Sequence, residues 1–194
     1  MVVNLRRYTV GVTTTRREQI LDTAATLFAE RGFHGVSVHD IGSACGISGP
    51  ALYKHFAGKG DILTQSLISI SERLLAEGRS RSENARSADE ALAALIDWHT
   101  EFALAHPALI VIQEREWANL EADGRREVRA LQLAYVDIWV DTVQHLRDDL
   151  DAAEARAAVQ ATFGLINSTP HSARISESSM ASRLARMARA ALLA

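Results

Sequence analysis

The side chains most often used in catalysis do not form a recognisable set in this sequence. None of the seven histidines has a companion at a spacing typical of metal ligands, and Cys45 is the single cysteine. The chain also lacks paired carboxylates, a glycine-rich phosphate loop and a nucleophile elbow. We therefore expect no enzymatic activity, no metal and no cofactor. A lone cysteine makes no internal disulfide and fits a reducing compartment.

A second set of polar residues lies around two short predicted helices. Ser37 opens a capping box with Asp40, and Ser48 is an N-cap followed by Pro50 in the first helical turn. Between the two helices, Gly46 allows a sharp change of direction. Two short helices joined in this way are typical of the helix-turn-helix of DNA-binding proteins.

The same segment resembles the signature of the tetracycline-repressor (TetR) family. The resemblance is carried by Val38 to Phe56 (VHDIGSACGISGPALYKHF), by Lys59 and Leu63 beyond it, and by the upstream residues Ile20, Leu21, Ala24, Leu27, Phe28, Gly32 and Phe33. Gly42 and Cys45 replace residues that are usually alanine in the family. The C-terminal two-thirds of the chain match the family only in the number and rhythm of their helices.

The resemblance implies a transcription regulator that places the second helix of the motif in the major groove of double-stranded DNA. The expected DNA contacts are Ser37, His39, Ser48, Gly49, Pro50, Tyr53, Lys54, His55 and Lys59. Among these, Tyr53 and Lys59 are expected to hold phosphate groups, and Lys54 to pair with the O6 and N7 atoms of guanine. For His39 and His55, a role as caps or plain surface residues is equally open.

The elements that must position these residues are predicted to be helices throughout. Only three prolines and eleven glycines occur in 194 residues, and apolar residues recur at helical spacing. We predict an all-α fold of about nine helices, at 15–31, 37–45, 49–56, 60–78, 89–105, 108–120, 125–150, 152–168 and 176–193. Residues 78–89 read as a loop and Asp123-Gly124 as a turn. A DNA-binding domain is expected at 14–74, and a domain for ligand binding and dimerisation at 75–194.

Charge is distributed unevenly along the chain. Residues 1–60 hold seven basic and four acidic residues (+3), which leaves fourteen basic and twenty acidic residues (−6) and a total of −3. A basic head on an acidic body suggests that only the head meets a polyanion. With no apolar run typical of a membrane span or secretory signal, we expect a cytoplasmic protein. Arg6 and Arg7 either reach into the minor groove or belong to a disordered tail.

One helix-turn-helix buries too little surface for tight specific binding, so we expect a homodimer on a palindromic operator. The last two predicted helices carry apolar seams that suit a four-helix bundle across a two-fold axis. The seam residues are Val159, Phe163, Ile166, Met180, Leu184, Met187 and Ala191. The alternative is that these stripes face only the core of their own subunit.

The resemblance further implies an effector pocket enclosed by the fourth to seventh helices, and repression that a ligand relieves. The candidate lining residues are Trp98, His99, Phe102, Gln113, Glu114, Trp117, Tyr135, Trp139 and Asn167. Glu114 is the most suggestive, because an inward-facing carboxylate requires a cation or a donor. The alternative places Glu114 on the solvent face, paired with Arg115 or Arg126.

The expected ligand is a small hydrophobic or acyl-CoA-like molecule. Arg125, Arg126 and Arg129 either bind the phosphate groups of such a ligand or form a solvated face. A DNA-binding regulator without small-molecule control is the alternative function, and a helical enzyme is a remote one.

Overall fold

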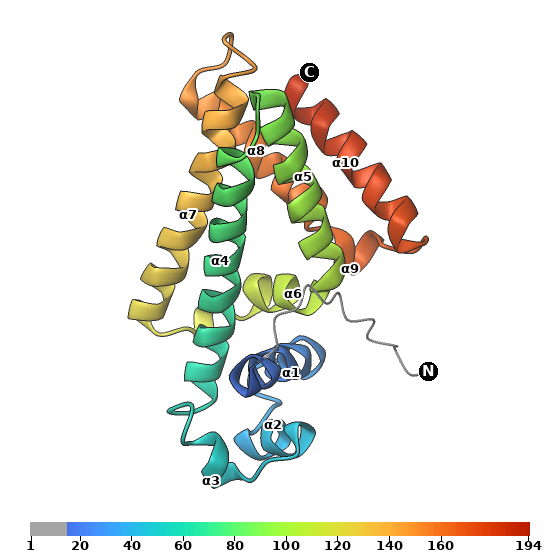
Figure 1. Ribbon diagram of the computed structural model, residues 1–194. Coiled ribbons are helices and arrows are strands. Elements are labelled where there is room, and N and C mark those ends of the chain that lie inside the picture. The colour runs from blue at the N-terminus through green and yellow to red at the C-terminus, as the bar shows by residue number, and fades with distance from the viewer. Residues whose placement is uncertain (1–14) are drawn as a thin grey trace.

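The computed structural model describes residues 15–194, so Arg6 and Arg7 lie outside the described range. Figure 1 shows a small head formed by α1, α2 and α3, a taller helical body, and α4 running from the one into the other. The helices are α1 (Arg16–Arg31), α2 (Val38–Cys45), α3 (Gly49–Leu52), α4 (Lys59–Glu83), α5 (Ala88–Ala105), α6 (Pro107–Arg115), the 3-10 turn η1 (Trp117–Asn119), α7 (Ala122–Gln144), α8 (Ala152–Ile166), α9 (Thr169–Ser172) and α10 (Glu177–Leu193).

The all-α prediction is confirmed. Each of the nine predicted helices has a counterpart, and residues 15–194 contain no strand. The single-turn helix α9 and the turn η1 were not predicted, because each is too short to show a helical period. No helix of the described part combines the length and the apolar content that crossing a bilayer requires.

The head is held together by the apolar face of α1. The hydroxyl of Thr15 and the carboxylate of Glu18 form a capping box at the start of α1, and Gly32 ends that helix with φ 73°. The buried side chains of this small core are Ile20, Leu21, Ala24, Leu27 and Phe28 of α1, with Ile41, Leu52 and Phe56 from the helix-turn-helix. Burying each large apolar side chain contributes roughly 1.5–3 kcal/mol, so α1 fixes the orientation of α2 and α3.

Helix α4 is longer than predicted. Gly78 does not end it, and the segment predicted as a loop from residue 78 is helical up to Glu83. The glycine is there for a close approach, since a Cβ atom on Gly78 would lie 2.5 Å from Cε2 of Tyr135. The boundary predicted between residues 74 and 75 falls inside α4, which contacts α1 in the head and α5 and α7 in the body.

The turn predicted at Asp123-Gly124 is wrong, because both residues belong to the first turn of α7. Gly124 is buried against α4, and a Cβ atom there would lie 2.4 Å from Cγ2 of Thr64. In both segments, the glycine lies inside a helix at a close contact between α4 and α7, and it does not end the helix.

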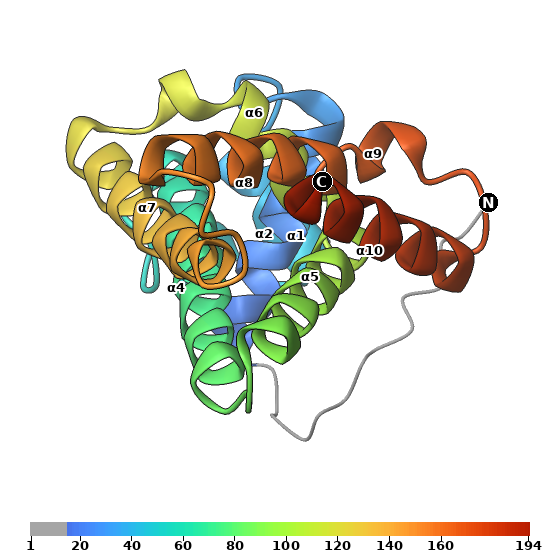
Figure 2. The ribbon, with the colours of Figure 1, turned by 90° about the horizontal axis from the view of Figure 1, so that it is seen from above.

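The body is a bundle in which α8 and α10 lie outside α5 and α7. Viewed from above, α8 crosses the back of the bundle and α10 lies along its outer edge beside α5 (Figure 2). The centre is closely packed, with Leu92, Leu95, Trp139, Val159 and Ile166 fully or almost fully buried. This rigid body is what positions α6 beneath it, against α1 of the head.

Candidate nucleic-acid interface and ligand site

The turn between α2 and α3 is tight because two glycines allow it. Gly46 follows α2 in the left-handed conformation, with φ 66° and ψ 35°. The amide of Ile47 donates to the carbonyl oxygen of Gly42 at 2.9 Å. A Cβ atom on Gly42 would lie only 2.9 Å from the carbonyl oxygen of Ile47. The glycine that departs from the family pattern therefore sits where the backbone of the turn folds back against α2.

The predicted DNA contacts on α3 and in the turn that follows it lie at the surface of the head; the helix predicted at 49–56 ends at Leu52, and residues 53–55 form a turn. Leu52 and Phe56 are buried and attach this segment to the core, while Tyr53 between them is 58% exposed. The exposed residues of the motif are Ser48, Pro50, Tyr53, Lys54 and His55, with Gly49 half-buried. The Ser48 hydroxyl accepts the amide of Ala51 as the predicted N-cap. The outward face of α3 is therefore free to meet DNA.

A shallow hollow of about 580 Å³ lies beside the N-terminus of α2. It is lined by His34, Gly35, Val36, Ser37, Val38, His39, Asp40, Tyr53 and Lys59. Unpaired amides at a helix N-terminus and a tyrosine hydroxyl both favour phosphate oxygens, so the hollow suits a group of the DNA backbone. Sequence reasoning missed His34, because it lies in the turn before α2, where no periodic pattern indicates which way a side chain points.

Ser37 uses its amide and its hydroxyl to cap α2. Its amide donates to Oδ2 of Asp40 at 2.8 Å, and its hydroxyl lies 2.5 Å from the same oxygen. These hydrogen bonds hold the pKa of Asp40 below its usual range. Since both donors of Ser37 are used within the cap, a phosphate in the hollow would meet the amides of Val38 and His39 instead.

The structure gives Lys59 a second role beside the phosphate contact that was predicted for it, and that contact stays a prediction. Its ammonium nitrogen donates to the carbonyl oxygens of Phe33 and Val36, both at 2.9 Å. It also lies 4.4 Å from the ring centre of Phe33. Lys59 therefore holds the turn between α1 and α2, and Lys54 is left as the exposed lysine of the motif.

Five of the predicted ligand residues meet inside the body. They are His99, Phe102, Tyr135, Trp139 and Asn167. They surround the imidazole of His99, on which the ring of Phe163 stacks at 4.5 Å and an interplanar angle of 10°. We call these five residues and Phe163 the His99 cluster.

Hydrogen bonds fix the protonation state of His99. Its Nε2 lies 3.1 Å from Oδ1 of Asn167, which only accepts, so Nε2 carries the hydrogen. Its Nδ1 then accepts from the Tyr135 hydroxyl at 3.4 Å. Burial lowers the pKa of His99 to about 4 and raises the pKa of Tyr135 above its usual value. The cluster is therefore electrically neutral at physiological pH.

Several polar atoms of the body are buried without a partner among the described residues, one of them on Trp139 of the cluster. They include Nε1 of Trp139, Oγ1 of Thr162 and Oγ1 of Thr100. A buried donor without an acceptor is costly, at roughly 1–3 kcal/mol. Such atoms suit a ligand that brings carbonyl or hydroxyl oxygens into the body.

Four predicted ligand residues lie elsewhere. Gln113 and Glu114 are exposed on α6, which is the solvent-facing alternative for Glu114, and Trp117 is half-buried in η1. Trp98 is buried, but its ring faces the guanidinium groups of Arg73 and Arg81 on α4. In the place expected for Glu114, the buried carboxylate is Glu116, which is 7% exposed. Glu114 and Glu116 lie at or just after the end of α6. There the helical repeat of apolar residues stops, so the sequence does not show which of the two carboxylates is buried.

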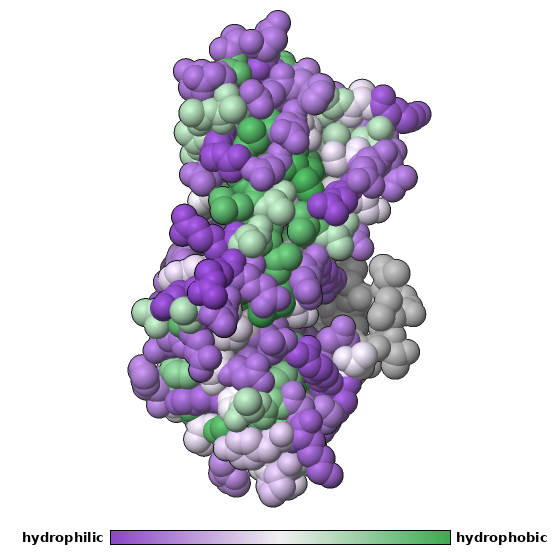
Figure 3. Space-filling model, turned by 90° about the vertical axis from the view of Figure 1, so that its left-hand side faces the viewer, coloured by the Kyte–Doolittle hydropathy of each residue, from purple (hydrophilic) through white to green (hydrophobic). Residues whose placement is uncertain are grey.

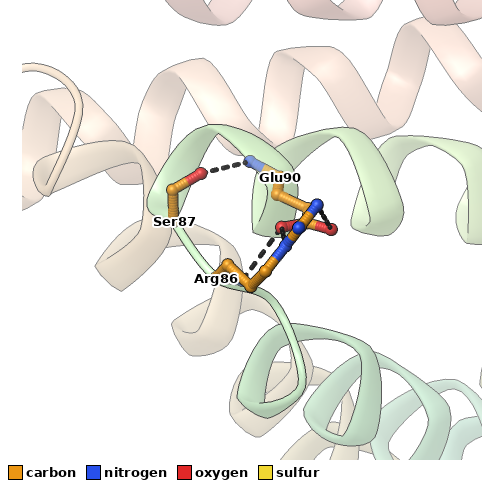
Figure 4. A network of polar contacts seen from close by, with 3 residues as sticks. All are labelled: Arg86, Ser87 and Glu90. Carbon is orange, nitrogen blue, oxygen red and sulfur yellow. Dashed lines mark hydrogen bonds and ion pairs between the residues drawn. The ribbon is translucent and has the colours of Figure 1, made fainter.

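A second hollow, of about 470 Å³, opens at the far end of the body. It is lined by Arg79, Ser82, Glu83, Ala85, Arg86, Ser87, Ala88, Ala91, Ile138, Asp141, Thr142 and His145. Figure 4 shows the polar network at its edge. There the Ser87 hydroxyl caps the amide of Glu90 at 3.2 Å, and Nε of Arg86 lies 3.1 Å from the Glu90 carboxylate. Hydrogen bonds from Arg86 lower the pKa of Glu90, which keeps the pair ionised.

The arginines at the start of α7 form no closed site. Arg126 and Arg129 are exposed, and Arg126 lies 2.6 Å from the carboxylate of Asp123 in the same turn. Of the two alternatives for these arginines, a phosphate site or a solvated face, this arrangement corresponds to the solvated face.

The predicted dimer seam divides into two parts. Val159, Ile166, Met180 and Leu184 are at most 6% exposed within the subunit, so they offer no surface to a partner. For these four residues the alternative holds, since they face their own core. Phe163 is half-buried in the His99 cluster, whereas Met187 and Ala191 are exposed on α10. After Leu184, the buried positions of α10 are Ala188 and Leu192. The predicted seam residues Met187 and Ala191 each lie one position earlier and therefore face outward.

Apolar surface also occurs on the other side of the body. A band of apolar side chains runs down the face on which α7 lies, with polar residues on both sides (Figure 3). On α7 itself, Leu133 is 41% exposed. Met187 on α10 is 46% exposed. Leu133 and Met187 are therefore among the large apolar side chains that remain exposed to solvent in the described subunit.

Comparison with known proteins agrees with these features. The family model described as bacterial regulatory proteins of the tetR family matches residues 20–65, and the model described as Tetracyclin repressor-like, C-terminal domain, matches residues 85–192. The transcriptional repressor KstR2 of Mycobacterium tuberculosis is 29% identical over 155 residues, which cover 73% of this chain and 74% of that repressor.

Solved structures show the same fold. That of KstR2 of Mycobacterium tuberculosis, described as a ketosteroid transcriptional regulator, has a TM-score of 0.75 and 24% identity, over 94% of this chain and 95% of that chain. The regulator FadR of Bacillus subtilis, in complex with stearoyl-CoA, has a TM-score of 0.70 and 18% identity, over 88% and 96%. Because the second family model alone spans more than half of the sequence, the chain belongs to the TetR family of bacterial regulatory proteins.

Proposed function

We propose that this protein is a transcriptional repressor that binds a palindromic operator as a homodimer and leaves it when a small hydrophobic or acyl-CoA-like ligand enters the body. The observation that carries the proposal is the exposed surface of α3 and of the turn that follows it, residues 53–55. Tyr53 and Lys54 point outward from a segment whose neighbours Leu52 and Phe56 are buried. In a dimer, two such helices would enter successive major grooves, roughly 34 Å apart.

The His99 cluster supports a ligand with a large apolar part. Its rings offer flat apolar surface, and the unpaired Nε1 of Trp139 offers a donor to an oxygen of the ligand. The hollow at the far end of the body reaches Ile138, which precedes Trp139 on α7, and it is lined by charged residues of both signs, Arg79 and Arg86 with Glu83 and Asp141. A regulator of the same fold has been described with stearoyl-CoA, a ligand of this amphiphilic kind.

The dimer in this proposal uses the exposed faces of α8 and α10. Met187 and Ala191 on α10 remain members of the interface, and the exposed alanines of α8 would let a partner helix approach closely. Enzymatic turnover is not expected, since the relatives are described as transcriptional regulators. A regulator that acts on bacterial DNA works in the cytoplasm, so that location belongs to the proposal as well.

The first test is the selection of genomic fragments by the purified protein, followed by titration of the selected duplex. We expect specific retention, and the change Tyr53→Phe should weaken all duplexes alike, because it removes a phosphate contact that carries no sequence information. The control is Glu114→Gln, an equally conservative change at an exposed residue of α6 outside the motif. A protein that retains no duplex even at low ionic strength would overturn the proposal.

The second candidate is a regulator without ligand control. The observation that favours it is the dense packing of the body, where Trp139 is fully buried and His99 is 3% exposed. Titrating the bound duplex with fatty acyl-CoA thioesters and sterol-like compounds separates the two. Release by one of them supports the repressor with an effector, and the absence of any shift in affinity across such a set supports the second candidate.

A further inference from the structure

Glu116 makes a contact between body and head that the proposed function does not use. It follows α6 and is 7% exposed. Its Oε1 accepts the amide of Phe33 at 3.1 Å, in the turn between α1 and α2. Its Oε2 accepts from Nδ2 of Asn119 at 2.7 Å, which fixes the carboxylate in place. Phe33 and Glu116 are 83 positions apart in the sequence, so this bond joins two separate parts of the fold.

Phe33 is held from its other side by Lys59. While Glu116 accepts the amide of Phe33, the ammonium group of Lys59 donates to its carbonyl oxygen and to that of Val36. Val36 is followed at once by Ser37, the N-cap of α2. The segment that leads into the helix-turn-helix is therefore fixed by one charged residue from the end of α6 and one from the start of α4.

No cation among the described residues pairs with the buried carboxylate of Glu116, and its recorded partners are a backbone amide and a side-chain amide. It also lies beside Gly32, at the C-terminus of α1, where a negative charge opposes the helix dipole. What the carboxylate adds is a strong, directional bond to one amide of the head, since hydrogen bonds to ions are about twice as strong as neutral ones.

A chain of ring contacts runs from the His99 cluster to the start of α6. The rings of His99 and Phe102 lie 6.0 Å apart, and those of Phe102 and His106 lie 5.5 Å apart in a stacked arrangement. His106 is the last residue before α6. A ligand that displaces α5 at the cluster would thus move α6, at whose other end Glu116 is located.

We propose that Glu116 is a positioning residue that, together with Lys59, clamps the Phe33 turn and thereby sets the orientation of α2 and α3 according to the position of α6. The regulatory part of this inference rests on the proposed function. The clamp itself is a property of the subunit, and it is measurable without DNA or ligand.

The test compares Glu116→Ala, Glu116→Gln and Glu114→Ala in the full-length protein. The glutamine keeps an oxygen for the Phe33 amide, and the exposed Glu114 is a matched control on the same helix. In Glu116→Ala, amide hydrogen exchange over residues 33–45 should become about tenfold faster, and affinity for the selected duplex should fall about tenfold. The salt dependence of binding should not change, because no phosphate contact is lost.

Glu116→Gln should fall between the unchanged protein and Glu116→Ala, because it keeps one acceptor for the Phe33 amide but loses the charge and the second acceptor, which faces Asn119. Glu114→Ala should not differ from the unchanged protein. Thermal unfolding followed by circular dichroism shows whether Glu116→Ala folds. If it does not fold, Glu116→Gln decides. Slow amide exchange over residues 33–45 in a folded Glu116→Gln supports the clamp, and fast exchange there overturns it. Unchanged exchange in a folded Glu116→Ala also overturns it. Faster exchange with unchanged duplex affinity overturns the positioning role. If the unchanged protein binds no duplex, the proposed function fails, and exchange over 38–45 alone decides whether α2 depends on the clamp.

Discussion

Nε2 of His99 lies 3.1 Å from Oδ1 of Asn167, and this contact joins the middle of α5 to the end of α8 inside the body. The arrangement requires a neutral imidazole. A protonated ring would have a hydrogen on Nδ1 as well, and it would lose the hydrogen bond that Nδ1 accepts from Tyr135.

We therefore predict that the free energy of unfolding falls as the pH is lowered from 6.5 to 4. Burial lowers the pKa of His99 from 6.5 to about 4, so in this window the unfolded chain takes up a proton that the folded chain does not. A shift of this size corresponds to roughly 3 kcal/mol, and the buried His106 acts in the same direction. Urea denaturation across this pH range measures the loss. In His99→Phe the loss should be clearly smaller, and an identical pH dependence would contradict the role of His99.

The two lysines of the chain should behave differently when removed. Lys54→Ala should alter the preference at one base position of the selected duplex and leave thermal stability nearly unchanged, because the side chain is exposed. Lys59→Ala should lower the melting temperature by several degrees, since it removes two hydrogen bonds to backbone carbonyls. Binding selections and calorimetry on both variants test this. A stable Lys59→Ala protein whose salt slope has fallen by about one would show a phosphate contact instead.

Two glycines within helices should respond to alanine with opposite signs. Gly78→Ala should destabilise the fold by about 1–3 kcal/mol, because the new Cβ atom would lie 2.5 Å from Cε2 of Tyr135. Gly164→Ala should stabilise α8 by up to about 1 kcal/mol, since nothing lies within 4 Å of a Cβ atom there. Chemical denaturation gives both values. A gain for Gly78→Ala would mean that α4 and α7 separate more easily than their packing indicates.

An acidic residue on the outer face of α10 should break the dimer. Met187→Asp places a charge where an apolar side chain is 46% exposed on the proposed interface. Ile175→Asp is the control, because Ile175 is similarly exposed but precedes α10. Size-exclusion chromatography with light scattering should show a monomer for the first variant and a dimer for the second. A dimer in both cases would place the interface elsewhere.

The sequence predicted the helices well wherever capping residues and an apolar period coincide. Thr15, Ser37 and Ser48 each cap the helix that was expected to follow them. The errors lie at glycines. Gly78 and Gly124 were interpreted as helix breaks, but each lies inside a helix at a point of close contact. Local sequence does not distinguish the two uses, because the residue that needs the space is more than fifty positions away.

The candidate sites were predicted less evenly. The exposed surface of α3 and the turn after it follows from the alternation of Leu52, Tyr53 and Phe56. The contacts of Lys59 with the Phe33 turn were not predicted, because its acceptors lie far earlier in the chain. In the body, composition alone indicated an aromatic site. It did not indicate that Trp98 faces arginines or that Glu116, and not Glu114, is the buried carboxylate.

The two glycine contacts also constrain how the molecule can move. Gly124 of α7 sits against Thr64 of α4, and Gly78 of α4 sits against Tyr135 of α7, so each helix contributes one notch and one knob. On α4 these points are fourteen residues apart, or roughly 21 Å. Two interlocks at that separation prevent the helices from sliding past one another. A displacement of α4 at the head therefore moves α7 with it as one rigid unit. The other helices of the body must then shift relative to this pair.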